Sequence, residues 1–265
     1  MKEHIAFFII ILLANIIQGV TSFAGTILAM PFSLMLVGID TAVPVLNFLG
    51  LLSGIYIFIQ SRKDVEWREL GRILRVMTPM IFVGLFLKSY LARFDRAIYI
   101  ALGVLVILIA VVGLHKSDIF NPVPKMSFLQ NDISGTGLKM SFLHAEHTKN
   151  ILNYLLLVAS GVVHGMFVCG GPLLVSYLTK RINDNKAFRA TISTVWIFLN
   201  GIMFITHIAT GKWTKPTIIS GAAAIPFLLA GMFIGSLLFK RMSKKAFMIL
   251  TYVLLLISGI SLLVK

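Results

Sequence analysis

The sequence has few charged residues and a single cysteine, and both shortages limit what the protein can be. Only 13% of its 265 residues are charged, whereas 58% are hydrophobic, and the mean hydropathy is +0.93. A soluble domain cannot keep a wettable surface at this composition, so we expect an integral membrane protein. The lone cysteine, Cys169, excludes an internal disulfide and any relay between paired thiols.

Acidic residues are scarcer than basic ones, and none falls inside a long apolar stretch. Proton- and sodium-coupled carriers often place a carboxylate inside the membrane, so any coupling here must use another group. The same absence excludes an intramembrane aspartyl protease, which needs two such aspartates. A serine hydrolase built on Ser22 and His164 lacks a nucleophile motif. We therefore expect no enzyme activity, no catalytic residues and no cofactor.

Long apolar runs are what the sequence has instead. A helix needs roughly 20 apolar residues to cross a hydrocarbon core about 30 Å thick. The stretches that qualify are Ile5–Gly19, Thr41–Ile59, Leu70–Leu87, Ala97–Leu114, Ile151–Val168, Ala190–Ile208, Thr217–Phe239 and Ala246–Val264. Two shorter apolar stretches, Thr26–Val37 and Pro172–Leu178, each follow a glycine-rich break. We predict an all-α polytopic membrane protein with eight long helices and two short, broken or hairpin helices.

The two breaks resemble each other, which indicates an internal repeat. GVTSFAGTILAMP spans Gly19–Pro31, and GVVHGMFVCGGP spans Gly161–Pro172. The pattern P-x4-G-x4-S also occurs twice, at Pro79–Ser89 and at Pro226–Ser236. Such pairs stay 141 to 147 residues apart along the chain (172 − 31 and 226 − 79 among them). The predicted organisation is a first membrane repeat at 1–115, a linker at 116–149 and a second membrane repeat at 150–265.

The basic residues predict the orientation of the two repeats. If each repeat has five helical segments, an odd number, the repeats lie inverted in the membrane. Sixteen loop lysines and arginines then fall on one face and seven on the other, so the positive-inside rule places both termini outside the cytoplasm. This rule explains the net charge of +14 without nucleic acid. The histidines near the linker, His115, His144 and His147, lack the cysteine or carboxylate frame of a metal site.

The paired breaks are the predicted substrate site. Transporters with inverted repeats hold substrate near the midplane, where broken helices direct backbone N–H groups and positive dipole ends at an anion. Close helix packing is the simpler explanation for any single glycine. The candidate binding residues are Gly19, Thr21, Ser22, Gly25, Thr26, Asn47, Gly161, His164, Gly170, Gly171, Arg189, Thr191, Ser193, Thr194 and Asn200.

Two of these candidates carry, or can acquire, a positive charge. His164 lies in the second break and can sense protons or bind an anion, although a packing role for this histidine is the alternative. Arg189 can reach inward to an anion through its planar guanidinium or extend outward to the surface. The hydroxyl and amide groups on the helices after each break can bind an anion or join helices to each other.

Together these features resemble the TauE/SafE family of sulfite and organosulfonate exporters. The resemblance lies in the glycine-rich break, its recurrence after a hydrophilic loop, the FRAT segment at Phe188–Thr191 and the P-x4-G helix in each half, and it covers essentially the whole chain. The first break has fewer glycines than family members often show. The resemblance implies an inner-membrane permease for small anions such as sulfite or sulfoacetate. We expect an exporter that works by alternating access, and a proton-coupled importer is the alternative. The expected partners of the protein are a small anion and the lipid bilayer. The sequence does not decide whether the protein forms a homodimer.

Overall fold

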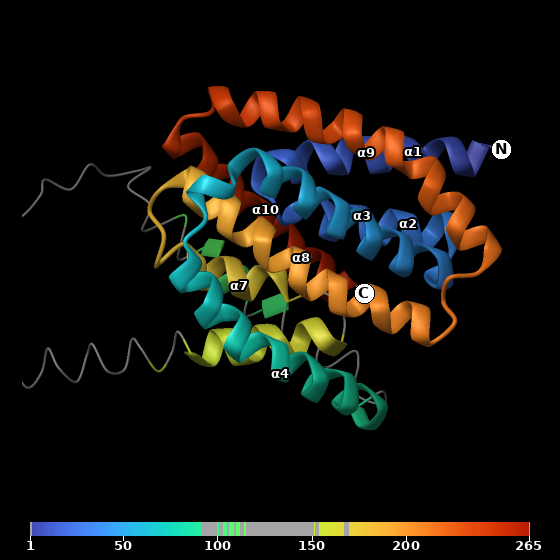
Figure 1. The fold of residues 1–265 in the computed structure, drawn as a ribbon, viewed down its shortest axis with the longest axis horizontal. Helices are drawn as coiled ribbons and strands as arrows, with labels where there is room; N and C mark the ends of the chain where they lie inside the picture. The colour runs from blue at the N-terminus through green and yellow to red at the C-terminus, as the bar shows by residue number, and fades with distance from the viewer. Residues whose placement is uncertain are drawn as a thin grey trace, which may run out of the picture.

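The computed structural model is helical throughout the residues that it describes, which are 2–91, 154–166 and 170–264 with residue 151 and scattered positions between 100 and 114. The labelled elements are α1 (Lys2–Thr21), α2 (Ala24–Val37), α3 (Ile39–Ser61), the 3-10 turn η1 (Arg62–Asp64), α4 (Trp67–Leu91), α7 (Gly171–Leu178), α8 (Asn185–Ala209), α9 (Lys215–Arg241) and α10 (Lys244–Val264) (Figure 1). A further helical segment covers 154–166.

The helices extend beyond the apolar stretches that predicted them. The stretch Ala190–Ile208 predicts α8, but the helix begins earlier, at Asn185. Its first turn is capped by Asp184, whose carboxylate accepts a hydrogen bond from the N–H of Ala187 at 2.8 Å. Hydropathy marks the part of a helix that lies in lipid, and polar turns continue the helix on either side.

Four described helices are long and apolar enough to cross a membrane: Ile39–Asp64, Trp67–Leu87, Asn185–Ala209 and Lys215–Arg241. Shorter apolar helices cover Ile5–Thr21, Tyr154–Met166 and Lys245–Ile257. The predicted linker 116–149 and Cys169 lie outside the described residues, as does much of the predicted span Ala97–Leu114. Length and composition thus support a multi-pass membrane protein.

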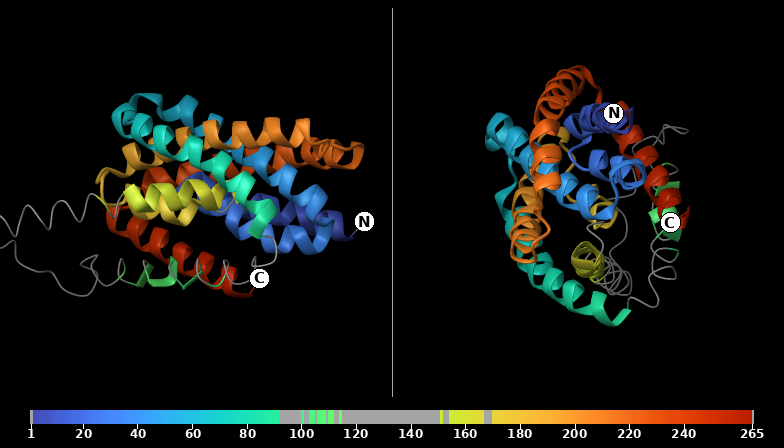
Figure 2. Two further views of the ribbon diagram at one scale, coloured as in Figure 1. Left: turned by 90° about the horizontal axis from the view of Figure 1, so that it is seen from below. Right: turned by 90° about the vertical axis from the view of Figure 1, so that its right-hand side faces the viewer.

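Two of the shorter apolar helices are arms of hairpins. α1 and α2 form the first hairpin, and both the N-terminus and the start of α3 lie at one end of the bundle (Figures 1 and 2). Segment 154–166 and α7 form the second hairpin, whose two outer ends lie at the opposite end, beside η1. The two hairpins therefore enter the bundle from opposite ends.

Each hairpin packs against a long helix from the other half of the chain. α1 lies along α9, where a Cβ added at Gly231 would come within 2.7 Å of the Leu12 carbonyl oxygen. Segment 154–166 lies equally close to α4, where a Cβ added at Gly84 would overlap the Val162 carbonyl oxygen. The glycine of each P-x4-G motif thus permits a helix crossing that no larger residue fits.

The end of the bundle that contains η1 is strongly basic, and we call it the basic end. Its turns join α3 to α4, α7 to α8 and α9 to α10. These turns and the adjoining helix ends carry Arg62, Lys63, Arg68, Arg72, Lys180, Arg181, Lys186, Lys240, Arg241 and Lys245. The turns are tied together, since the Tyr177 hydroxyl donates to Glu69 Oε2 at 2.9 Å. At the N-terminal end, Lys212 Nζ lies 2.8 Å from Asp40 Oδ1.

Candidate functional site

Ser22 and Phe23 form the first break, between α1 and α2. Ser22 has a φ of 69°, in the left-handed region, which costs a residue with a side chain roughly 1–2 kcal/mol. Its N–H donates to the Gln18 carbonyl at 2.7 Å. The Thr21 hydroxyl accepts a hydrogen bond from the N–H of Ala24 at 3.3 Å. The residues of α1 therefore hold the reversed chain in place.

Gln18 completes this break. Its Oε1 accepts the N–H of Gly25 at 2.9 Å, and its Nε2 donates to Ser53 Oγ at 3.3 Å. A side chain at position 25 would overlap the Gln18 side chain and the Ala14 carbonyl oxygen, so glycine is required there. The sequence predicts free N–H groups at the start of α2, but those of Ala24 and Gly25 already have partners in α1.

The second break lies between segment 154–166 and α7, and its described part includes Gly170 and Gly171. The Gly170 carbonyl accepts a hydrogen bond from Ser160 Oγ at 2.8 Å. A side chain at Gly170 would meet the Ser160 carbonyl oxygen and His164 Cβ. Pro172 lies in the first turn of α7, where its missing N–H removes no helical hydrogen bond. The described part of this break thus depends on glycine, as the first break does at Gly25.

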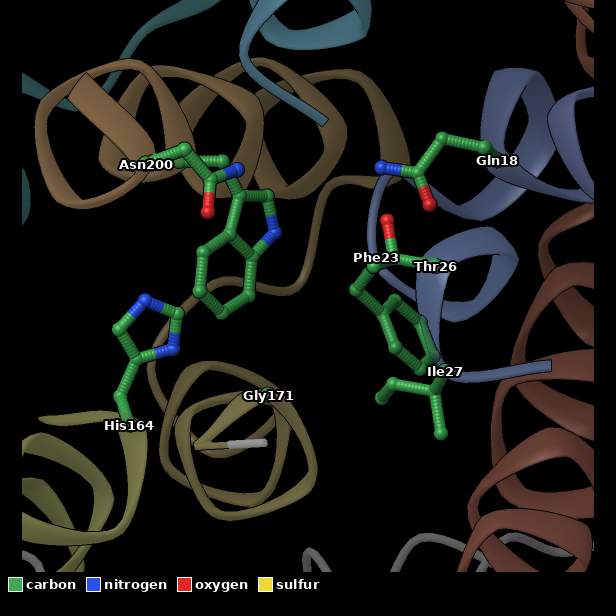
Figure 3. Close-up of a pocket in the computed structure, with 8 residues that line it drawn as sticks. Gln18, Phe23, Thr26, Ile27, His164, Gly171 and Asn200 are labelled. Atoms are coloured by element: carbon green, nitrogen blue, oxygen red, sulfur yellow. The ribbon is translucent and has the colours of Figure 1, made fainter. Parts of the chain in front are cut away.

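Residues from both breaks line one small cavity. The lining residues are Gln18, Phe23, Thr26, Ile27, His164, Gly171, Trp196 and Asn200, and none of them is acidic. Gln18 and Thr26 lie on one side and His164 and Asn200 on the other, with their polar ends toward the space between (Figure 3). The cavity volume is about 30 Å³, enough for two or three water-sized atoms since one water needs roughly 10–15 Å³.

His164 and Trp196 contribute buried polar atoms to this cavity wall. Both ring nitrogens of His164 and Nε1 of Trp196 lack a hydrogen-bond partner among the described residues. The two ring centroids are 5.5 Å apart. A buried polar group without a partner costs roughly 1–3 kcal/mol. A polar ligand in the cavity would provide the hydrogen bonds that the described residues do not.

Asn47 lies behind the cavity and orients one of its lining residues. Its Nδ2 donates to Asn200 Oδ1 at 3.2 Å, across the close contact of α3 and α8. Gly50 allows this approach, because a Cβ there would come within 2.9 Å of Asn200 Nδ2. Asn47 is therefore a positioning residue, whereas Asn200 lines the cavity itself.

The structure places Arg189 outside this small cavity, and its predicted role as a substrate ligand stays a prediction. Its Nε and Nη2 donate to the Gly19 carbonyl at 2.9 and 2.7 Å, and Nη2 also donates to Ser236 Oγ at 2.8 Å. Gly19 lies in the last turn of α1, where carbonyls lack helical partners and the helix dipole favours a cation. Arg189 therefore caps α1, and its guanidinium packs 4.6 Å from the Phe239 ring.

The remaining predicted residues make structural contacts. Ser193 and Thr194 donate to carbonyls one turn earlier in α8. Thr191 Oγ1 accepts the N–H of Glu66 at 3.0 Å, which joins α8 to the start of α4. Gly161 packs against α4 with no space for a side chain. Of the predicted site residues, the cavity brings together Thr26, His164, Gly171 and Asn200.

Four lining residues are absent from the sequence prediction: Gln18, Phe23, Ile27 and Trp196. Gln18 carried a usable signal, since an amide inside an apolar span needs a partner. The Trp196 N–H is a similar signal, because indole is a donor that usually finds a partner when buried. Phe23 and Ile27 carried none, since apolar residues are expected everywhere in such a chain.

A second cavity, of about 480 Å³, lies toward the N-terminal end. Its lining includes the Asp40 and Lys212 pair, and, deeper in the bundle, Gly165, Met166 and Met203. Gly165 and Met166 directly follow His164 in the chain. The turn that carries His164 therefore separates this larger cavity from the small one.

The described residues thus form a bundle of helices, four of them long and apolar enough to cross a membrane, with a small cavity between two helix breaks. Residues 7–262 match the family described as Sulfite exporter TauE/SafE, which is nearly the whole chain. The protein therefore belongs to the TauE/SafE family, whose members are membrane transporters and not enzymes, and the predicted family is confirmed. The comparisons with curated proteins and with solved structures found no match.

Proposed function

We propose that this protein exports a small anion such as sulfite through the cavity between the two helix breaks. The observation that carries this proposal is the buried pair His164 and Trp196, whose nitrogens lack partners among the described residues. Hydrogen-bond donors in a wall without carboxylates suit an anion. Sulfite has four non-hydrogen atoms, more than the two or three that fit the cavity of about 30 Å³, so substrate binding requires the cavity to widen, and sulfite requires less widening than the longer sulfoacetate.

The proposed mechanism is alternating access between two inverted repeats. Two observations support it: the hairpins enter from opposite ends, and each packs against the P-x4-G helix of the other half. By the positive-inside rule, the basic end faces the cytoplasm of an inner membrane and both termini lie outside. Rocking of the repeats then exposes the cavity to each side in turn.

The cavity of about 480 Å³ is the proposed outer half of the pathway. Opening it to the substrate requires movement of the wall formed by Gly165, Met166 and Met203. An inside-negative potential favours anion efflux by about 2.3 kcal/mol per charge at 100 mV. Export therefore needs no coupling ion. A proton-coupled importer is the alternative, favoured by the position of the titratable residue His164 in the cavity wall.

Sulfite efflux from proteoliposomes tests the proposal. Trp196→Phe removes one N–H from the cavity, and we expect efflux to fall about 10-fold or more, since hydrogen bonds to charged groups contribute roughly 1.5–3 kcal/mol. Trp213→Phe is the matched control, because Trp213 also has a buried Nε1 without a described partner but packs against Phe48 and Phe204.

Equal sulfite efflux with and without protein would overturn the transport proposal. An equal loss of efflux in Trp196→Phe and Trp213→Phe would show that the cavity is not the transport site. An imposed pH gradient separates exporter from importer. Exporter flux follows the membrane potential alone. Importer flux rises with an inward proton gradient and loses that response in His164→Ala.

A further inference from the structure

A third cavity lies at the basic end, between α3, α8 and α9. Its volume is about 510 Å³, and it is separate from the small cavity lined by His164. Arg189, which caps α1, forms part of its wall together with Ser236. We call this cavity the basic groove. No part of the transport proposal uses it.

The basic groove has a surplus of positive charge. Lys186 at the start of α8 and Lys240 at the end of α9 line it with Arg189, against one carboxylate, Asp64. Both lysines are exposed, and neither forms an ion pair with a described residue. Two free ammonium groups beside a buried guanidinium therefore attract an anionic group.

The wall that α9 contributes to the groove is apolar and open before it reaches Lys240. Phe233 and Leu237 line it, with 59% and 46% of their surfaces exposed. They lie four residues apart on α9, so they form one stripe along that helix. From Lys240 this stripe leads away from the basic end along α9, a helix long and apolar enough to cross a membrane. A small hydrophilic anion gains nothing from such a wall, whereas an acyl chain does.

We propose that the basic groove binds an anionic phospholipid. The phosphate lies between the ammonium groups of Lys186 and Lys240, and an acyl chain follows Phe233 and Leu237. Basic pockets between helices at a membrane surface recognise lipid headgroups in this way, with each Lys or Arg contributing about 1 kcal/mol, which is about fivefold in affinity. The proposal is independent of what the central cavity transports.

Titration of the purified full chain in detergent tests this site. The probe is dioctanoyl phosphatidylglycerol, with dioctanoyl phosphatidylcholine as the zwitterionic reference. The variant K186Q/K240Q removes both groove lysines, and R62Q/K63Q is the matched control, since it removes the same charge from exposed positions of the neighbouring η1 that do not line the groove.

We expect the wild-type protein to bind phosphatidylglycerol on the order of 20-fold more tightly than phosphatidylcholine, as two lysine contacts predict. K186Q/K240Q loses this preference, and R62Q/K63Q keeps it. The thermal midpoint rises with the bound lipid in the same pattern. Equal loss in the two variants would mean diffuse attraction, and the same midpoint shift with inorganic phosphate or sulfite alone would mean a small-anion site; either result overturns the lipid proposal, as does the absence of a preference.

Discussion

The two hairpins are alike in shape but differ in how their breaks are satisfied. In the first, Thr21 and Gln18 bind the N–H groups that start α2, and Arg189 binds the Gly19 carbonyl. In the second, Ser160 binds the Gly170 carbonyl, but the ring nitrogens of His164 have no described partner. Backbone groups of the first break are thus bound by side chains, whereas the second hairpin adds an imidazole without a described partner to the cavity wall.

The repeat predicted from the sequence pairs positions of the two breaks and suggests how this difference arises. Gln18 and Ser160, Gly19 and Gly161, and Ser22 and His164 are each 142 residues apart (160 − 18, 161 − 19, 164 − 22). Gln18 and Ser160 both brace the backbone of their own break. Ser22 and His164 are both buried with polar atoms that lack described partners. A histidine where the other half has a serine therefore gives the cavity its one titratable ring.

The largest loss of stability is expected at the contact between the first hairpin and Arg189, which belongs to the second half of the chain. Arg189→Gln removes the charged donors that bind the Gly19 carbonyl and Ser236. We expect a loss of about 2–4 kcal/mol of stability, since a buried carbonyl is left without its partner and charge-assisted hydrogen bonds are lost. Chemical denaturation in detergent measures the change.

Arg181→Gln is the matched control for this variant. Arg181 Nε lies 3.8 Å from Glu69, and its side chain remains 33% exposed. Such a pair contributes at most about 1 kcal/mol. A similar small loss for Arg189→Gln would show that the first break closes without its cap.

Glycine substitutions compare the docking of the two hairpins directly. A Cβ at Gly84 would overlap the Val162 carbonyl oxygen, and one at Gly235 would overlap that of Ile16. We expect Gly84→Ala and Gly235→Ala each to destabilise the protein by about 1–3 kcal/mol through overpacking. Gly71→Ala, on the same helix as Gly84 but with open space around it, should stabilise by up to about 1 kcal/mol. If only one of these two variants lost stability, the two hairpins would not depend on their glycine contacts in the same way.

The smallest expected effect concerns the backbone of the first break. Ser22→Gly relieves a left-handed conformation and should stabilise the protein by up to about 1 kcal/mol. Sulfite efflux should be unchanged if the first break is only a scaffold. A gain in stability with a loss of efflux would instead assign the buried Ser22 hydroxyl to the substrate site, and would make the two breaks functionally equivalent.

Much of the fold could be predicted from the sequence because apolar runs and glycine breaks are local features. α2 is predicted at Thr26–Val37 and found at Ala24–Val37. The residues of the site were harder to predict, because a side chain lines the cavity only if it lies on the face of its helix that is turned toward the cavity. Arg189 and Trp196 lie seven residues apart on α8, yet one caps α1 and the other lines the cavity. Only packing between helices distinguishes them.

The docking of α1 against α9 has a consequence for how the chain is made. α1 ends at Thr21, and α9 begins at Lys215. At about 5–20 residues per second, a ribosome needs on the order of ten seconds or more to complete the helix that α1 packs against. During that interval the Gly19 carbonyl has not met Arg189 and the glycine crossing has not formed. The first hairpin is therefore synthesised well before α9 and reaches its final contacts only after α9 is complete.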